Sequence, residues 1–320
     1  MSEAQKLIVS PSPHLKAKDT VQSAMFDVIY ALIPVTIVSI VIFGYYAVFL
    51  VAVCLVTAML TEFLFRKILK KPVTLHDGSA IVTGLLVALL FGPGTPWWTA
   101  ALATFIAIGV AKELMGGLGW NRFNPALLGR VAVILFYPLF HQFTGAFAPL
   151  RPDFGVIDTA TQATPLAMLM QGTYLPLSQL FTAYEGGSLS ETSALAVLLG
   201  GVYLLYKKHI SWHIPAAIIG AVLIMALLMG ENPLYHILAG GVMIGAFFMA
   251  TDWVTSPITQ KGKVIFGVAI GVLLMLFRVP LAPTEGMAFA ILIMNAFVPM
   301  IDRVTKRPSF SEPKSKPAPV

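Results

Sequence analysis

Apolar stretches long enough to cross a lipid bilayer alternate with short polar segments along this chain of 320 residues. The hydrocarbon core of a bilayer is about 30 Å thick and takes roughly 20 apolar residues in an α-helix. The pattern predicts ten helices, at residues 24–42, 45–65, 79–92, 97–115, 126–143, 192–206, 213–230, 233–251, 264–280 and 285–302. The third is short and stops at a Gly-Pro-Gly-Thr-Pro segment, so we interpret it as half a helix. The expected fold class is an all-α polytopic membrane protein.

The composition agrees with this class. Hydrophobic residues make up 57% of the chain and charged residues 11%, with a mean hydropathy of +0.82, whereas soluble domains carry about 25% charged residues. The first twenty residues are polar, and the first apolar stretch runs on into a second, which argues against a cleavable signal peptide. The segment from Pro308 to Val320 is rich in Pro, Lys and Ser, and we expect it to be disordered.

The positions of the basic residues predict the orientation in the membrane. Lys and Arg accumulate in the cytoplasmic loops of membrane proteins. Placing the N-terminus in the cytoplasm puts all 21 Lys and Arg residues except Arg151 and Arg278 on that side. Both termini are therefore expected to be cytoplasmic, and the long loop near residues 144–191 extracytoplasmic. The net charge of +6 follows from this topology, so it does not call for a nucleic-acid partner.

The ten predicted helices divide into five and five around the long loop. Because five is odd, the second set starts from the opposite face, as in transporters built from inverted repeats. Gly- and Pro-rich breaks occur in both sets, although these residues are also common in ordinary membrane helices. The expected organisation is a cytoplasmic segment (1–21), a first repeat (22–143), an extracytoplasmic loop (144–191), a second repeat (192–302) and a cytoplasmic tail (303–320).

Cysteine and histidine usage limits the redox chemistry of the chain. Cys54 is the one cysteine, so neither a disulfide framework nor an iron–sulfur centre can form. The six histidines are scattered; His209 and His213 are four residues apart but flank the start of the seventh predicted helix, where interfacial histidines are the simpler interpretation. No metal site is expected, and any redox function would need an organic cofactor.

A glycine-rich segment at residues 112–127 leads into the fifth predicted helix. Asn121 or Asn124 can cap that helix, and Pro125 suits its first position. The start of a helix offers free N–H groups and a positive dipole end to a polar ligand.

Several motifs together resemble one membrane-protein family. They are NRFNPA at 121–126, DGSA at 77–80, TG at 83–84, ATD at 250–252, SP at 256–257, GK at 262–263, PTEGMAFA at 283–290 and the segment 295–302. From about residue 11 to residue 307 the chain resembles the D subunit of the Rnf ion-translocating electron-transfer complex. It is more distantly similar to the B subunit of the sodium-pumping NADH:quinone reductase. The fold implied by this resemblance is similar to that of urea transporters.

The long loop contains a segment that resembles the signal for covalent flavin attachment, D-x-x-(S/T)-G-A-(S/T). The resemblance implies FMN bound through a phosphoester to Thr164, transferred from FAD by a separate flavin transferase. The matching residues are Asp158, Thr161, Ala163 and Thr164. Gln162 replaces the usual glycine; it adds bulk and removes conformational freedom, which could slow the transfer. The alternative is an unmodified polar loop.

The resemblance also implies a non-covalent riboflavin near the cytoplasmic side, at Asn121 and Asn124. The alternative is that both amides only cap the turn. Acidic positions linked to ion handling in the related quinone reductase match Glu62, Asp252 and Asp302. All three lie at predicted cytoplasmic helix ends, where ordinary interfacial carboxylates are the competing interpretation. Glu113 adjoins Lys112, and these two could simply pair.

The function implied is electron transfer between ferredoxin and NAD through flavins, coupled to Na⁺ or H⁺ movement across a bacterial inner membrane. The chain would be inactive alone. Its partners would be the membrane-embedded A and E subunits, the FMN-bearing G subunit and the iron–sulfur B and C subunits. A redox-silent channel or transporter for a small solute is the alternative class, and a purely scaffolding role in the complex is a third.

Overall fold

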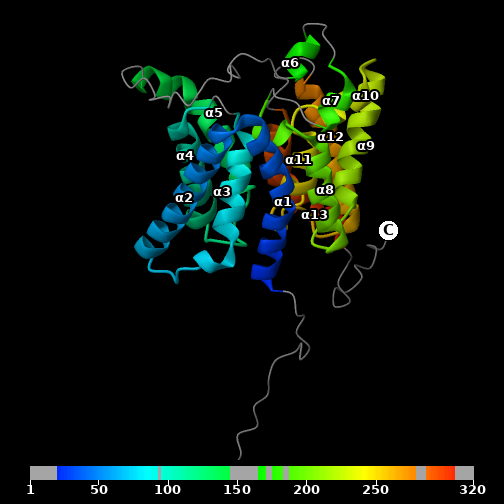
Figure 1. The fold of residues 1–320 in the computed structure, drawn as a ribbon. Coiled ribbons are helices and arrows are strands. Elements are labelled where there is room, and N and C mark those ends of the chain that lie inside the picture. The colour runs from blue at the N-terminus through cyan, green and yellow to red at the C-terminus, as the bar shows by residue number, and fades with distance from the viewer. Residues whose placement is uncertain are drawn as a thin grey trace, which may run out of the picture.

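The computed structural model describes residues 20–92, 95–144, 165–170, 175–182, 187–278 and 286–306. Within these ranges all regular structure is helical, and the long helices stand side by side as an upright bundle (Figure 1). In the described chain, five helices are long and apolar enough to cross a membrane: Val21–Phe43, Tyr45–Ile68, Trp97–Leu114, Gln260–Arg278 and Gly286–Thr305. Four shorter apolar helices accompany them. The expected class, a helical polytopic membrane protein, is confirmed.

The first part of the described chain forms two long helices, a 3₁₀ turn and four shorter helical segments. In order they are α1 (Val21–Phe43), α2 (Tyr45–Ile68), the 3₁₀ turn η1 (Leu75–Asp77), α3 (Ser79–Leu90), α4 (Trp97–Phe105), the π-helix η2 (Ile106–Leu114) and α5 (Pro125–Thr144). Thr20 begins α1 through a capping box with Ser23. Gly44, at φ 59°, lets the chain reverse between α1 and α2 without the strain that a side chain would add.

The second part begins with short helices that the hydrophobic pattern does not predict. In order the elements are α6 (Pro165–Met170), α7 (Leu177–Thr182), the 3₁₀ turn η4 (Leu189–Glu191), α8 (Ala194–Tyr206), α9 (His213–Leu228), α10 (Pro233–Leu238), α11 (Val242–Ile244), the π-helix η5 (Gly245–Met249), α12 (Gln260–Arg278) and α13 (Gly286–Thr305). The helix expected at 233–251 is interrupted at Gly240 and Gly241, both at positive φ, so α10 and α11 are separate.

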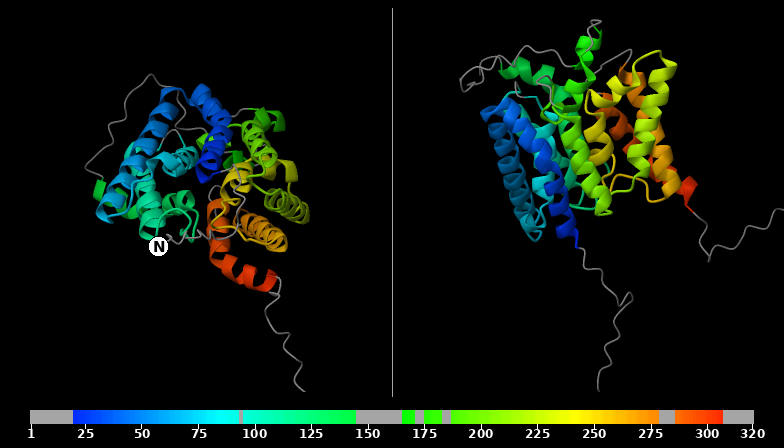
Figure 2. Two further views of the ribbon diagram at one scale, coloured as in Figure 1. Left: turned by 90° about the horizontal axis from the view of Figure 1, so that it is seen from below. Right: turned by 45° about the vertical axis from the view of Figure 1, so that its right-hand side comes forward.

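The helices of the two parts form two groups that meet at α1 and α8. Viewed along the bundle, the early helices lie on one side and the late helices on the other (Figure 2). α2 packs against α3 and α4, α9 against α12, and α1 against α8. Gly200 of α8 makes this last contact possible, because a Cβ there would collide with the carbonyl oxygen of Ala31. A small residue thus lets the two groups approach closely.

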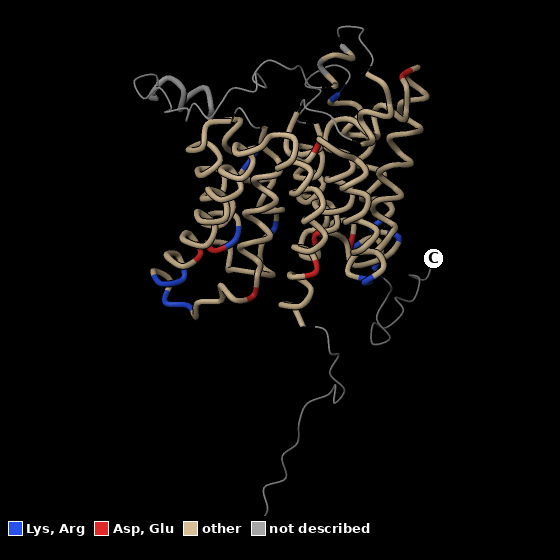
Figure 3. The backbone as a smooth tube through the Cα atoms, viewed as in Figure 1, with Lys and Arg blue, Asp and Glu red and all other residues tan. Residues whose placement is uncertain are grey.

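Lys and Arg gather at the end of the bundle where the described chain begins and ends (Figure 3). We call this the basic end; the segments that follow α2 and α8 lie there (Figure 1), and they contain Lys70, Lys71, Lys207 and Lys208. Short helices α6 and α7 lie at the opposite end (Figure 1).

Candidate functional site

A cavity of about 340 Å³ lies where the two groups of helices face each other. Its wall is mostly apolar and comes from α1, α3, η5 and the segments before α5 and after α8. Its polar and charged side chains are three hydroxyls and five larger groups: Ser79, Thr83, Thr251, Lys112, Asn121, Asn124, His209 and Asp252. A mainly apolar cavity with a few polar groups is the usual form of a small-molecule site.

The two asparagines have different local roles. Asn124 caps α5, because its Oδ1 accepts a hydrogen bond from Leu127 N at 3.2 Å, while its Nδ2 donates to Met249 O at 3.1 Å. Asn121 does not make this capping bond; its Nδ2 faces Asp252 Oδ2 at 3.5 Å. Both side chains are buried. Asn124 therefore ties the start of α5 to the end of η5, and Asn121 points toward the acidic side of the cavity.

Asp252 lies in the turn that follows η5. Its Oδ2 accepts a hydrogen bond from Thr255 Oγ1 at 3.0 Å, and its Oδ1 is 3.5 Å from Val254 N. Burial raises the pKa of this carboxyl above its ordinary value, and the hydrogen bonds from Thr255, Val254 and Asn121 only partly oppose that rise. Asp252 is thus placed to hold or release a proton, or to bind a cation, at the cavity wall.

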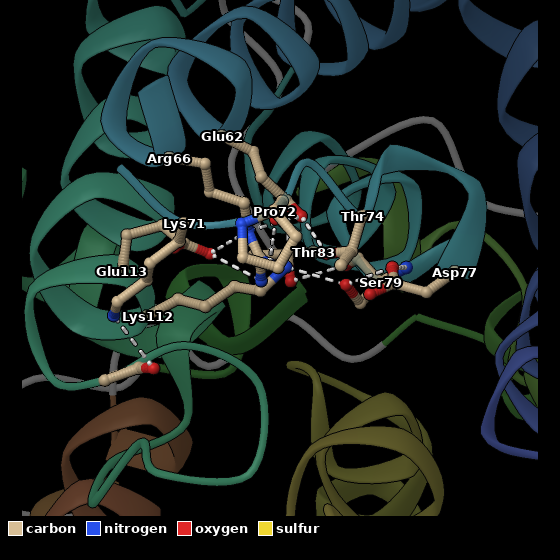
Figure 4. A network of polar contacts seen from close by, with 11 residues as sticks. Glu62, Arg66, Lys71, Pro72, Thr74, Asp77, Ser79, Thr83, Lys112 and Glu113 are labelled. Carbon is tan, nitrogen blue, oxygen red and sulfur yellow. Dashed lines mark hydrogen bonds and ion pairs between the residues drawn. The ribbon is translucent and has the colours of Figure 1, made fainter. Parts of the chain in front are cut away.

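A cluster of four buried charged side chains, whose contacts Figure 4 shows, adjoins the cavity through Lys112. Glu62 and Arg66 belong to α2, and Lys112 and Glu113 to η2; Glu62 and Glu113 are fully buried and Lys112 is 2% exposed. Lys112 Nζ lies 2.7 Å from Glu62 Oε2, and Arg66 Nη2 lies 3.2 Å from Glu113 Oε1. The suggestion that Lys112 and Glu113 pair with each other is therefore wrong. Each charge pairs across the α2–η2 contact instead.

Ser79 connects this charge cluster to the cavity. Lys112 Nζ donates to Ser79 Oγ at 2.7 Å, and Ser79 Oγ donates to Asp77 Oδ1 at 2.6 Å. Thr74 Oγ1 donates to Glu62 Oε1 at 3.3 Å, so the loop before α3 closes over the cluster. Lys112 and Ser79 belong to both the cluster and the cavity wall. A change of charge inside the cavity would therefore change the electrostatic energy of the Lys112–Glu62 ion pair.

Both groups of helices contain a π-helical stretch, and each stretch supplies part of the site. η2 carries Lys112 and Glu113, and η5 ends just before Asp252. π-helical backbone is rare and is frequently found at functional sites. In η2 it accompanies an unusual outcome, since the consecutive residues Lys112 and Glu113 are both buried.

A second polar contact, between Asp27 and His209, lies beside the cavity at the basic end. His209 Nε2 lies 2.7 Å from Asp27 Oδ2, and Tyr203 Oη donates to Asp27 Oδ1 at 2.6 Å. Asp27 comes from α1, Tyr203 from α8 and His209 from the segment after α8. Asp27 was missed among the sequence-based candidates. The signal was present, because Asp27 is the single acidic residue within the first predicted helix, and a charge inside a membrane helix is costly unless it is paired.

The remaining predicted positions lie elsewhere. Asp302 of α13 accepts a hydrogen bond from Ile258 N at 3.0 Å and belongs neither to the described cavity wall nor to the charge cluster. The structure thus brings Asn121, Asn124 and Asp252 together, places Glu62 behind Lys112, and leaves Asp302 apart. The attachment segment, with Asp158, Thr161, Ala163 and Thr164, lies outside the described residues.

The fold and the site define a class: a polytopic helical membrane protein with a buried charge cluster beside an internal ligand cavity. The model of the NQR2, RnfD, RnfE family matches residues 8–311. The chain belongs to this family.

Relatives over nearly the whole chain are named as the D subunit of ion-translocating complexes. The chain is 42% identical over 315 residues to the D subunit of the Na⁺-translocating ferredoxin:NAD⁺ oxidoreductase complex of Acetobacterium woodii, covering 97% of each chain. It is 38% identical over 332 residues to the proton-translocating counterpart of Clostridium ljungdahlii, covering 97% of this chain and 99% of the relative. The D subunit of the ion-translocating oxidoreductase complex of Stutzerimonas stutzeri is 36% identical, with 90% and 92% covered.

Proposed function

We propose that this chain is the D subunit of an Rnf complex, which passes electrons through bound flavin between ferredoxin and NAD⁺ and couples that transfer to Na⁺ or H⁺ movement. The observation that carries the proposal is the end-to-end similarity to relatives named as this subunit. Its partners in the complex are the A, B, C, E and G subunits. The relatives are named for different ions, so the coupling ion stays open between Na⁺ and H⁺.

The cavity is the proposed position of a non-covalent riboflavin. Its apolar wall suits a flat aromatic ring, and the amides of Asn121 and Asn124 offer donors and acceptors for the ring edge or the ribityl chain. The flavin would supply the electron-transfer chemistry, and the protein positions it and sets its electrostatic surroundings. Lys112 and the carboxyl group of Asp252 both belong to the wall around it.

Thr164 is the proposed attachment point for FMN. Support comes from the match to the attachment signal and from the residue that follows. Tyr235 Oη donates to Pro165 O at 2.9 Å, and Leu166 packs with Tyr235, Leu180 and Ala239. α6 is thereby fixed on α10 directly after Thr164.

The cation pathway is proposed to include Glu62 and Asp252. Asp302, which lies apart from the cavity wall and the charge cluster, is a third candidate. Glu62 and Asp252 are carboxylates at two sides of one polar region, connected through Lys112 and the cavity. Both Na⁺ and H⁺ favour such oxygens.

The architecture is proposed to be two inverted five-segment repeats in the bacterial inner membrane. Support comes from matching contacts: α2 packs on α4 as α9 packs on α12, and α5 packs on η2 as α13 packs on α12. The third segments of the two repeats also begin alike. Gly78 precedes α3 and Gly241 precedes α11, and both glycines have left-handed backbone conformation. The basic end would face the cytoplasm, with α6, α7 and the FMN on the other side.

Flavin fluorescence after denaturing electrophoresis tests the covalent FMN. The chain is co-expressed with its flavin transferase, and the expected result is a fluorescent band that disappears in Thr164→Ala and persists in Thr159→Ala. A dark wild-type band would contradict covalent flavin and favour the redox-silent channel. Electron transfer that persists in the complex with Thr164→Ala would favour the scaffolding role.

A further inference from the structure

We propose that Asp27 and His209 form a proton-transfer pair that supplies the cavity from the basic end. The proposal rests on the proposed function in one respect: the acceptor in the cavity is taken to be the flavin. The role of the pair is to match an electron that reaches this flavin with a proton drawn from the side of the membrane that bears the basic residues.

The backbone holds His209 firmly at the cavity wall. His209 N donates to Leu204 O at 3.1 Å and Lys208 N to Leu205 O at 3.0 Å, which together end α8 in a Schellman-type turn. Lys208 takes φ 59° there, a conformation that residues other than glycine seldom adopt. Trp253 Nε1 donates to His209 O at 2.6 Å from the segment after η5. These contacts fix the position from which the imidazole reaches Asp27.

The side-chain contacts orient the imidazole ring. Asp27 Oδ2 holds Nε2 at 2.7 Å, and Tyr203 Oη at 2.6 Å holds the other carboxylate oxygen. Nδ1 is then the ring nitrogen left to act, and His209 forms part of the cavity wall. A carboxylate that fixes one nitrogen of a histidine while the other exchanges a proton is the arrangement by which enzymes prepare an imidazole for acid–base work.

The proton balance is simple. A bound flavin would supply the electron-accepting chemistry, with the electron coming from the ferredoxin side of the complex; the His209 imidazolium would give up its Nδ1 proton to match that electron. The imidazole is left neutral, with Nε2 still on Asp27, and regains one proton from water at the basic end. Histidine suits this task because its imidazole can both accept and donate a proton in general acid–base chemistry.

The titratable groups near the pair come from α1, from the segment after α8 and from the opposite cavity wall. Lys207 Nζ lies 3.7 Å from Asp27 Oδ1 and is 44% exposed, so it links the pair to water at the basic end. Tyr30 lies on α1 near the Tyr203 hydroxyl. Across the cavity, Lys112 and Asp252 are the other titratable groups in the described wall. The competing interpretation is purely structural, namely that Asp27 only fastens α1 to α8.

The test uses the purified complex in lipid nanodiscs, with His209→Gln and His209→Ala in this chain. Reduced ferredoxin is mixed rapidly, and the rate at which the non-covalent flavin is reduced is followed between about pH 5.5 and 8.5, on either side of the ordinary histidine pKa. At pH 7 we expect His209→Gln to lower this rate about 10²-fold, a typical effect of losing a general acid. The pH profile of His209→Gln should be flatter than that of the wild type, and added imidazole should partly restore His209→Ala. The matched control is His213→Gln, which leaves the cavity wall unchanged.

The outcomes separate this proposal from the one on which it rests. Flavin released by denaturation is measured in every variant. A full flavin content with a wild-type rate and pH profile in His209→Gln overturns the proton-transfer role alone. A loss of flavin or of thermal stability in His209→Gln, with the pH profile of the remaining flavin unchanged, supports the structural role and likewise overturns it. A wild-type complex without non-covalent flavin overturns both proposals.

Discussion

At the scale of single residues, the buried charge cluster dominates the energetics of the site. Glu62, Arg66, Lys112 and Glu113 balance to zero net charge inside the protein. A buried ion pair adds little to stability relative to apolar residues of the same size, but removing one member leaves an uncompensated charge. The consequence is that pairs, and not individual residues, should be the units of mutational sensitivity.

The Glu62–Lys112 pair allows a direct test. Glu62→Gln and Lys112→Met should each destabilise the fold by about 3–5 kcal/mol. The double variant should be less destabilised than the sum, because neither charge is then left alone. Thermal unfolding of the purified protein measures all three. Additive losses in the double variant would contradict the direct pairing.

Replacing Asp252 should stabilise the fold at neutral and alkaline pH, whereas replacing Glu62 or Lys112 should destabilise it. The raised pKa of Asp252 means that the folded state holds the proton more tightly than the unfolded state. The associated stability is complete below the ordinary pKa of about 3.9 and is lost as pH rises through the higher folded value. Asp252→Asn should therefore raise the unfolding midpoint at pH 8, and its advantage should shrink toward pH 4. A stability lower than wild type at pH 8 would contradict this account.

Some residues of the cavity and the charge cluster could be predicted from the sequence, and others could not, for physical reasons. Asn121, Asn124 and Asp252 lie in short motifs that carry the family resemblance, and the structure brings them together. Arg66 and Lys112 looked like ordinary basic residues at helix ends, because a sequence does not reveal which face of a helix end is buried. His209 could not be paired with Asp27, since the two are 182 residues apart.

At the scale of elements, close packing between helices depends on a few glycines. At Gly200 an added Cβ would meet the Ala31 carbonyl and Phe248, whereas nothing lies within 4 Å of the corresponding position at Gly220 on α9. The same substitution should thus have opposite effects in two helices of the same group.

Gly200→Ala is expected to lower the unfolding midpoint, because α1 and α8 must move apart. Gly220→Ala should be neutral or stabilising by about 0.5–1 kcal/mol, the usual gain of alanine over glycine within a helix. Circular dichroism during heating measures both variants. Equal effects at the two positions would contradict the packing of α1 on α8.

The periodic pattern predicted where the long helices lie, and it could not predict their internal geometry. α1, α2, α12 and α13 begin and end within about four residues of their predicted limits. The π-helical stretch η2 escaped prediction because a change of helix type over nine residues leaves no visible trace in an apolar sequence. Helices α6 and α7 are six residues each, too short to show periodicity.

At the scale of the whole molecule, the two ends of the helix bundle differ: one is the basic end and the other carries α6 and α7. Labelling can therefore determine which end faces which side of the membrane. Cys54 is fully buried and is the chain's one cysteine, so new surface cysteines can report sidedness against a quiet background. Lys208 and Gln179 are exposed at the two ends.

Lys208→Cys and Gln179→Cys should therefore label differently in intact cells. A membrane-impermeant maleimide should modify Gln179→Cys and spare Lys208→Cys until the membrane is permeabilised. Labelling is read by mass spectrometry, with Cys54→Ala as background. The reverse pattern would invert the topology inferred from the charges.

The bond from Tyr235 to Pro165 would limit how far the proposed flavin on Thr164 could travel. Consecutive Cα atoms are about 3.8 Å apart, so a flavin on Thr164 would hang one residue away from a fixed point on α10. However long the loop before it, the carrier's reach would be set by its own side chain and phosphate. The neighbouring redox proteins would then have to come to this flavin, because its tether is too short for it to swing out to them.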